Sequence, residues 1–248
     1  ISETNRGSPI MNQKKLFPVI HPLNWAQLLN QADLCKGVEV DGVFLINQGH
    51  TKPGHVYSNF IKLIEDTARI KQLFDLWVGI NILDKSPFFV VPLLTYYGID
   101  GYWTDTYNSW EVKNLAGCCP IESTFISNYY PSFDFKYQEQ QAKEETRDEI
   151  ISALANRIWN CQMVITTSGP ATGEPPDIEK IKWFRDIIGP DCTLAIASGI
   201  NSENIESFLP YADHFLVSSS LEDKYGYFNE EKLKTMVQII KSYNEENQ

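Results

Sequence analysis

The sequence predicts an α/β protein built as a single (β/α)8 barrel. Eight short runs of β-branched and aromatic residues recur along the chain, and helical patterns separate most of them. The runs start roughly 20–35 residues apart, which is the length of one βα unit. The 248 residues fit one barrel of about 250 residues. A doubly wound open sheet is the alternative, but it usually has fewer strands.

The eight runs are nearly continuous in apolar residues, as in parallel strands that are buried on both faces. Seven of them have definite positions, namely 17–21, 40–47, 76–83, 99–104, 162–167, 193–197 and 213–218. The fifth strand lies within 124–137, where two pieces compete, 124–129 and 133–137.

Helices are expected between these strands. The apolar periodicity places them at 25–36, 58–72 and 138–160, with Ser58 as the N-cap of the second. Asp177 and Asn201 are the expected N-caps of the next two helices, and the charges of Glu230 and Glu231 after Asn229 suit the N-terminus of the last. The fourth helix is short, about 109–116, because a Gly-Cys-Cys-Pro segment interrupts it.

No segment rich in Gly, Ser or Pro divides the chain, so we expect a flexible N-terminal tail over 1–15 and one barrel domain over 16–248. The tail lacks the basic and apolar regions of a secretory signal. The longest apolar run, 87–98, is too short to cross a bilayer. Five cysteines, an odd number without CxxC spacing, predict free thiols and a cytoplasmic location.

The formal net charge of −11 argues against nucleic acid as a partner, because binding of the phosphate backbone depends on Lys and Arg. It argues equally against anionic membranes. A small phosphorylated ligand remains compatible, because a local site can oppose the net charge.

Catalytic residues of such barrels lie at the carboxyl ends of the strands. His21, Asp105 and Lys136 follow the first, fourth and fifth strands and are the candidate acid, base and oxyanion stabiliser. The alternative for Lys136 is an ion pair with Asp105 or Asp134 that holds the rim. Two amides at strand ends are candidates for binding substrate hydroxyls, Asn47 and Asn81.

Small residues end the last two strands, and they predict a phosphate site built from backbone N–H groups. The candidate phosphate-binding residues are Ser198, Gly199, Ile200, Ser218, Ser219 and Ser220. The alternative is a tight turn in which Gly199 supplies a positive φ.

The loop over 166–177 contains three prolines and two glycines and has the length of a ligand-embracing loop. Its candidate substrate-binding residues are Thr167, Ser168, Gly169, Thr172 and Gly173. The alternative is a rigid turn into the next helix.

Three segments resemble the BtpA/SgcQ family of the ribulose-phosphate-binding barrels: Ser168-Gly-Pro-Ala-Thr-Gly-Glu-Pro-Pro-Asp177, Ala197-Ser-Gly-Ile-Asn-Ser-Glu-Asn204 and Ala212-Asp-His-Phe-Leu-Val-Ser-Ser219. Segments 41–47 and 79–83 resemble its second and third strands, and 133–138 resembles its fifth, which ends in a lysine. The chain departs from the family at 116–132 and after His21. One member of that family is linked to photosystem I biogenesis and another to a sugar operon.

The resemblance and the strand ends give two hypotheses. The first is an enzyme acting on a phosphorylated sugar, nucleotide or phosphoribosyl compound by isomerase, lyase or transferase chemistry. The second is a non-catalytic assembly or regulatory factor that retains the pocket. No metal or cofactor is expected, because His50 and His55 lack nearby ligands and nucleotide-binding glycine motifs are absent. Aromatic residues in 103–110 predict an interface between copies.

Overall fold

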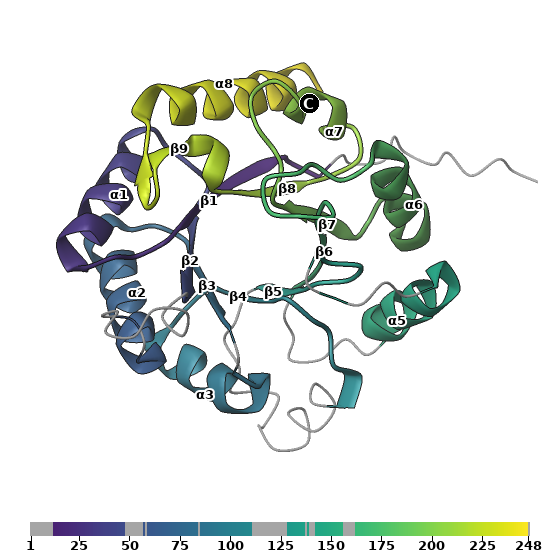
Figure 1. The fold of residues 1–248 in the computed structure, drawn as a ribbon, viewed down its shortest axis with the longest axis horizontal. Coiled ribbons are helices and arrows are strands. Elements are labelled where there is room, and N and C mark those ends of the chain that lie inside the picture. Colours follow the sequence, from purple (N-terminus) through teal and green to yellow (C-terminus); the bar gives the residue numbers. More distant parts are fainter. Residues whose placement is uncertain are drawn as a thin grey trace, which may run out of the picture.

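Eight parallel strands close into a barrel in chain order, with helices on its outside (Figure 1). This computed structural model describes residues 12–47, 57, 59–83, 85–110, 128–136, 138, 142–155 and 162–247. The prediction of a single (β/α)8 barrel is confirmed. The strands are β1 (Lys15–Ile20), β2 (Val43–Asn47), β3 (Val78–Ile82), β4 (Gly101–Thr104), β5 (Asn128–Pro131), β6 (Gln162–Thr167), β7 (Thr193–Ala197) and β8 (His214–Val217).

Helices lie between most of the consecutive strands of the barrel. They are α1 (Trp25–Gly37), α2 (Phe60–Phe74), α3 (Pro87–Tyr97), α5 (Lys143–Ala155), α6 (Ile178–Ile188), α7 (Ile205–Phe208) and α8 (Glu230–Glu246). Between β8 and α8 the chain adds a 3-10 turn, η4 (Ser219–Leu221), and a small antiparallel hairpin, β9 (Glu222–Lys224) with β10 (Tyr227–Phe228). In the described ranges, none of the helices has the length and apolar character needed to cross a membrane.

One of the predicted N-caps is confirmed and two are wrong. Asp177 accepts a hydrogen bond from the Glu179 N–H, as predicted, and Asn229, which the sequence pattern did not single out as a cap, accepts one from the Lys232 N–H at the start of α8. The cap of α2 is Asn59 rather than Ser58, and α7 starts after Asn204 rather than at Asn201. Asn201 instead closes the turn before α7, accepting from the N–H groups of residues 203 and 204. Of the expected fourth helix, residues 111–116 lie outside the described residues.

The fifth strand lies within the expected range 124–137 but matches neither of the two competing pieces. β5 overlaps the first piece by only two residues, and the described residues of the second, 133–136, form no strand. The apolar pattern at Phe133 and Phe135 resembles that of a strand because both side chains are buried. Phe133 is buried between the barrel and the helices, and Phe135 is buried inside the barrel. Between them Asp134 has a φ of 46°, which turns the chain out of extended structure. Residues 133–136 therefore belong to the loop after β5.

Each strand buries side chains on two faces, which explains why the runs are continuous rather than alternating. In β7, Leu194 and Ile196 pack toward the helices, while Ala195 and Ala197 face the barrel interior. Aromatic rings fill much of that interior. The ring centroids of Phe17 and Trp77, for example, lie 4.9 Å apart.

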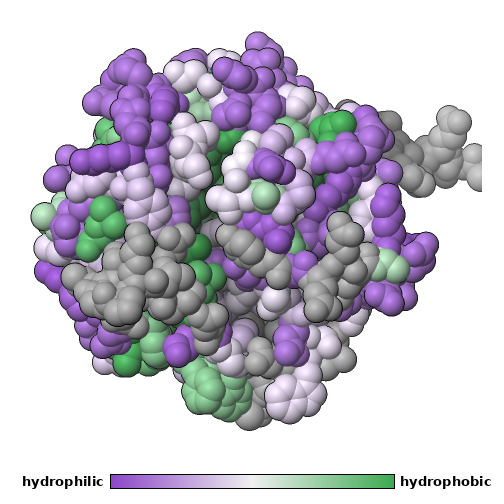
Figure 2. Space-filling model, in the orientation of Figure 1, coloured by the Kyte–Doolittle hydropathy of each residue, from purple (hydrophilic) through white to green (hydrophobic). Residues whose placement is uncertain are grey.

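Trp103 also belongs to the interior, with only 5% of its surface exposed. It is therefore not part of a surface interface, although Trp110 is 72% exposed. Other exposed aromatic side chains lie on α3, where Phe89 and Tyr96 are exposed. Figure 2 shows a mainly hydrophilic face, with hydrophobic residues gathered at its lower edge in the region of α3. Self-association of the chain stays a prediction.

Pairing of β1 with β8 closes the barrel, and one buried carboxylate supports the closure. Lys15 to Pro18 pair with His214 to Val217. Directly before β8, Asp213 lies 3.0 Å from the Lys14 ammonium and 2.6 Å from the Arg185 guanidinium. It also accepts the Leu194 N–H at 2.9 Å. Lys14 and Lys15, which fall within the expected tail, are thus parts of the barrel.

Replacing Asp213 with alanine is expected to lower the free energy of unfolding by about 3–5 kcal/mol, because the buried Lys14 and the half-buried Arg185 lose their partner. Urea denaturation measures the change. Asp223→Ala is the control, since Asp223 pairs with Lys232 on the surface and its loss is expected to leave the midpoint nearly unchanged. Equal effects of the two substitutions would contradict a structural role for the buried carboxylate.

Candidate functional site

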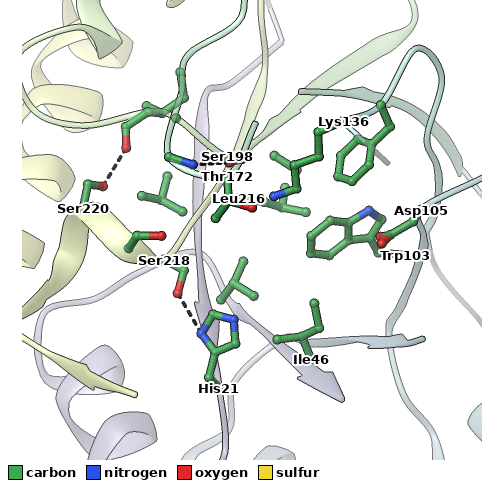
Figure 3. A pocket seen from close by; sticks show the side chains of 18 of the residues that line it. His21, Ile46, Trp103, Asp105, Lys136, Thr172, Ser198, Leu216, Ser218 and Ser220 are labelled. Carbon is green, nitrogen blue, oxygen red and sulfur yellow. Dashed lines mark hydrogen bonds between the residues drawn. The ribbon is translucent and has the colours of Figure 1, made fainter. Parts of the chain in front are cut away.

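A cavity of about 350 Å³ lies at the carboxyl ends of the strands, where catalytic sites of such barrels occur. Its floor is the last layer of interior side chains, including Val19, Ile46, Trp103 and Leu216. The loops after β1, β4, β5, β6, β7 and β8 form the walls (Figure 3). An apolar floor beneath polar walls is the usual construction of a small-molecule site.

One wall consists of the loops after β7 and β8, from Ser198 to Asn201 and from Ser218 to Ser220. The Ser220 hydroxyl donates to the Ile200 carbonyl at 2.6 Å and joins the two loops. The backbone N–H groups of Gly199, Ile200, Ser219 and Ser220 donate to no other described residue. Four adjacent unused donors give this wall the capacity to bind an anion without a cationic side chain.

The loop after β6 packs directly onto this wall. The Gly173 N–H donates to the Ser198 hydroxyl at 3.1 Å, and both Thr172 and Gly173 line the cavity. Ser198 has a φ of 99°, which is unusual for a residue with a side chain. Gly199 has a φ of 78°, and a Cβ there would lie 2.1 Å from the Glu174 carbonyl oxygen. Gly199 is therefore needed both for its backbone conformation and for the seating of this loop.

The opposite wall carries Lys136 and Asp105. The Lys136 side chain points from the loop after β5 into the cavity (Figure 3). Its backbone N–H donates to the Ser168 hydroxyl at 3.0 Å. The Asp105 carboxylate accepts from the Asn81 amide at 2.8 Å, which holds it at the end of β4.

Asp134, one of the two alternative partners expected for Lys136, forms an ion pair with Lys180. The Lys180 ammonium lies 3.0 Å from the Asp134 carboxylate and donates to the backbone carbonyls of Asp134 and Ser168 at 2.5 and 2.9 Å. Burial lowers the pKa of Lys180, and the charge of Asp134 partly offsets this effect. Lys180 thus joins the loops that follow β5 and β6, from which Lys136 and Thr172 reach the cavity.

His21 follows β1 and lies beside Ser218 and Glu222. Its Nδ1 is 3.1 Å from the Ser218 hydroxyl and 3.3 Å from the Glu222 carboxylate. Its ring lies beside that of Tyr225, tilted by 32° and with centroids 5.1 Å apart. Burial alone would raise the pKa of the Glu222 carboxyl, but hydrogen bonding and charge from His21, with help from Gly226 and Ser218, place it below its ordinary value.

The structure brings most of the expected site residues to the cavity, but not all. The expected residues that line it are His21, Asp105, Lys136, Thr172, Gly173, Ser198, Gly199, Ile200, Ser218, Ser219 and Ser220. Those outside the lining are Asn47, Asn81, Thr167, Ser168 and Gly169.

Four of the five outlying residues support or adjoin the loops around the cavity. Asn81 positions Asp105, and the Thr167 hydroxyl donates to the Asp134 carbonyl at 3.3 Å. The Ser168 hydroxyl is engaged by two backbone groups. Gly169 lies beneath the loop, where a Cβ would come 2.0 Å from the Glu174 carbonyl oxygen. Polar residues at strand ends are therefore divided between the cavity and the support of its loops.

Sequence reasoning missed Glu222 and Tyr225 beside His21. Both lie in the hairpin after η4, which the strand and helix patterns do not predict. Glu222 is one of 32 acidic residues, and its position four residues after Ser218 is an insufficient signal by itself. Its contact with His21 spans 201 positions in the chain and appears only when the barrel closes.

In the part of the chain that the structure describes, no group of three His, Cys, Asp or Glu side chains could hold a metal ion. His50 and His55 lie outside the described residues. So do three of the five cysteines, while the buried Cys35 is a free thiol.

Solved structures with similar folds are TIM barrels that include enzymes of phosphorylated compounds. Phosphoribosyl anthranilate isomerase from Thermus thermophilus matches with a TM-score of 0.61 and 16% identity, over 92% of this chain and 99% of that chain. The enzyme from Pyrococcus furiosus matches with a TM-score of 0.60 and 12% identity, over 92% and 99%. Phospho-2-dehydro-3-deoxyheptonate aldolase from Thermotoga maritima matches with a TM-score of 0.66 and 12% identity, over 95% and 70%.

At these identities the likeness establishes the fold alone. No family model and no curated protein matches the sequence, so membership of the BtpA/SgcQ family stays a prediction.

Gly199→Ala is expected to destabilise the protein more than Gly173→Ala. Both positions have positive φ, which costs an alanine roughly 1–2 kcal/mol. At Gly173 a Cβ meets nothing within 4 Å, whereas at Gly199 it meets the Glu174 backbone. Urea denaturation of the two variants measures the difference. A smaller loss at Gly199 would show that the loop after β6 does not rest on this wall.

Proposed function

We propose that this protein is an enzyme that binds a phosphorylated sugar, nucleotide or phosphoribosyl compound and acts on it by isomerase, lyase or transferase chemistry. The observation that carries the proposal is the asymmetry of the cavity. One wall offers unused backbone N–H groups, and the others offer an imidazole, a carboxylate and an ammonium group.

The phosphate is assigned to the wall formed by residues 198–201 and 218–220. Backbone donors in loops bind phosphate well because small side chains allow the oxygens to approach closely. A barrel commonly uses the loops after its seventh and eighth strands in this way. Such a site also explains how a chain with a net charge of −11 can retain an anion, since no lysine or arginine is required.

The reacting part of the ligand is assigned to the space between His21 and the opposite wall, which carries Lys136 and Asp105. Proton transfer beside a sugar carbonyl needs a base, an acid and a group that stabilises the developing oxyanion. His21 and Asp105 are titratable groups on different strands, and the Lys136 ammonium supplies positive charge. These three side chains supply the groups that such a reaction requires.

The enzymes with similar folds support the class of substrate. The isomerases act on a phosphoribosyl anthranilate, and the aldolase is named for a phosphorylated keto sugar acid. Their identity to this chain is too low to transfer a reaction, so the choice among the three reaction types rests on experiment.

Ser219→Asp is expected to weaken binding of ribose 5-phosphate at least tenfold, while Ser219→Asn retains it. The two substitutions have nearly the same size, and Ser219 is exposed, so the added charge is the main difference. Two like charges about 4 Å apart repel by about 1–4 kcal/mol in a solvated site, and 1.4 kcal/mol corresponds to tenfold in affinity.

Isothermal titration calorimetry with ribose 5-phosphate measures these affinities, and ribose is the control ligand. Equal binding of ribose and ribose 5-phosphate by the natural protein would contradict a phosphate site. So would equal affinity of the two Ser219 variants.

Lys136→Met is expected to slow proton exchange on a bound ketose phosphate at least 100-fold, the usual contribution of a positioned acid, base or charge. Deuterium incorporation beside the carbonyl, followed by ¹H NMR over a panel of ketose phosphates, is the measurement. Lys182→Met is the control, because Lys182 pairs with Glu179 on the surface. Binding of these compounds without any exchange or turnover would favour the non-catalytic alternative.

A further inference from the structure

The small hairpin between η4 and α8 places a second charged group beside the candidate base. Glu222 is the first residue of β9, and its carboxylate lies 3.3 Å from the His21 Nδ1. The two side chains are only 10% and 13% exposed. Tyr225, near the tip of the same hairpin, covers one face of the imidazole. A histidine with a shielded carboxylate on one nitrogen is the arrangement that fixes a tautomer.

The hydrogen bonds at Nδ1 define where the ring proton sits. The Ser218 hydroxyl donates to the Glu222 carboxylate at 3.2 Å, so toward His21 the Ser218 oxygen acts as an acceptor. The Glu222 carboxylate, whose pKa lies below its ordinary value, also only accepts. Both neighbours of Nδ1 therefore require a donor, and Nδ1 keeps its proton.

The other ring nitrogen of His21, Nε2, can act as a base. A neutral imidazole that is protonated at Nδ1 has its lone pair at Nε2. No described residue forms a hydrogen bond with Nε2, and Figure 3 shows this edge of the ring turned toward the cavity. Nε2 is thus available to take a proton from a ligand and to return it.

The backbone around the pair is fixed as well. The Gln27 amide of α1 donates to the Gly226 carbonyl at the hairpin tip and, at 3.4 Å, to the His21 carbonyl. One side chain therefore joins the end of β1 to the hairpin that carries Glu222. Burial, and then the charge of Glu222, raise the pKa of Tyr225, so the ring beside His21 is a neutral phenol. The remaining charged groups of the cavity, Asp105 and Lys136, lie on its opposite wall.

We infer that Glu222 is a positioning residue that holds His21 as the Nδ1–H tautomer and makes Nε2 the basic atom of the cavity. The inference rests on the proposed function, because the basic atom matters only where a proton is transferred. Ser218 is not a nucleophile activated by His21. In a nucleophile–His–carboxylate triad the nucleophile and the carboxylate bind opposite ring nitrogens, whereas here both contact Nδ1.

The experiment is ¹⁵N NMR of the imidazole nitrogens in the ligand-free protein, at a pH where the ring is neutral. A His21→Asn variant identifies the His21 signals. The natural protein is expected to show a protonated Nδ1 and an unprotonated Nε2. Glu222→Gln is expected to make this tautomer the minor form, because the amide replaces the acceptor-only carboxylate with a group that also donates.

Asp223→Asn is the matched control. It removes the same charge one residue further along the hairpin, where the carboxylate faces Asn229 and Lys232 instead of His21. It is expected to leave the His21 tautomer unchanged. The inference is overturned if the natural protein carries its proton on Nε2, or if the two hairpin variants behave alike. The first of these outcomes needs no variant to fold.

This measurement is independent of the test of the proposed function. The tautomer is read without ligand, so a wrong tautomer leaves phosphate binding untouched. Conversely, a protein that binds ribose no less well than ribose 5-phosphate but shows the Nδ1–H tautomer would overturn the phosphate site and not the role of Glu222.

Discussion

The first and last strands of the barrel pair in parallel over Lys15–Pro18 and His214–Val217, and the candidate site depends on this closure. It brings His21 next to Ser218 and Glu222, which are about 200 positions away in the chain. Asp213 supports the junction from below, because its carboxylate binds Lys14, Arg185 and a backbone N–H of β7. A carboxylate so deeply buried is tolerated because each of its oxygens has a charged partner.

The interior of the barrel sets the depth of the cavity. Large rings such as Phe17, Trp77 and Tyr130 pack against one another and fill the barrel below the strand ends. Space for Trp77 exists because Gly101 lacks a side chain, and a Cβ there would lie 2.3 Å from the indole. The cavity therefore lies above the aromatic layer, among the loops, and one of its walls consists mainly of backbone and short side chains.

Four of the loops around the cavity support one another rather than projecting freely. Lys180 joins the loops after β5 and β6, Gly199 seats the latter on the loop after β7, and Ser220 joins the loops after β7 and β8. This interlocking explains why some polar residues at strand ends never reach the cavity. The hydroxyls of Thr167 and Ser168 instead form hydrogen bonds with backbone groups of the loop after β5.

The sequence by itself determined the barrel, seven of its eight strands and the end of the barrel where the cavity lies, because continuous apolar runs and their spacing are local properties. Only the tertiary structure decided the fifth strand, since Phe133 and Phe135 are buried by contacts with distant residues while the backbone between them turns. It also decided which strand-end residues enter the cavity. Glu222 became visible beside His21 only through closure of the barrel, because hydrogen bonds between side chains about 200 residues apart leave no periodic trace in the chain.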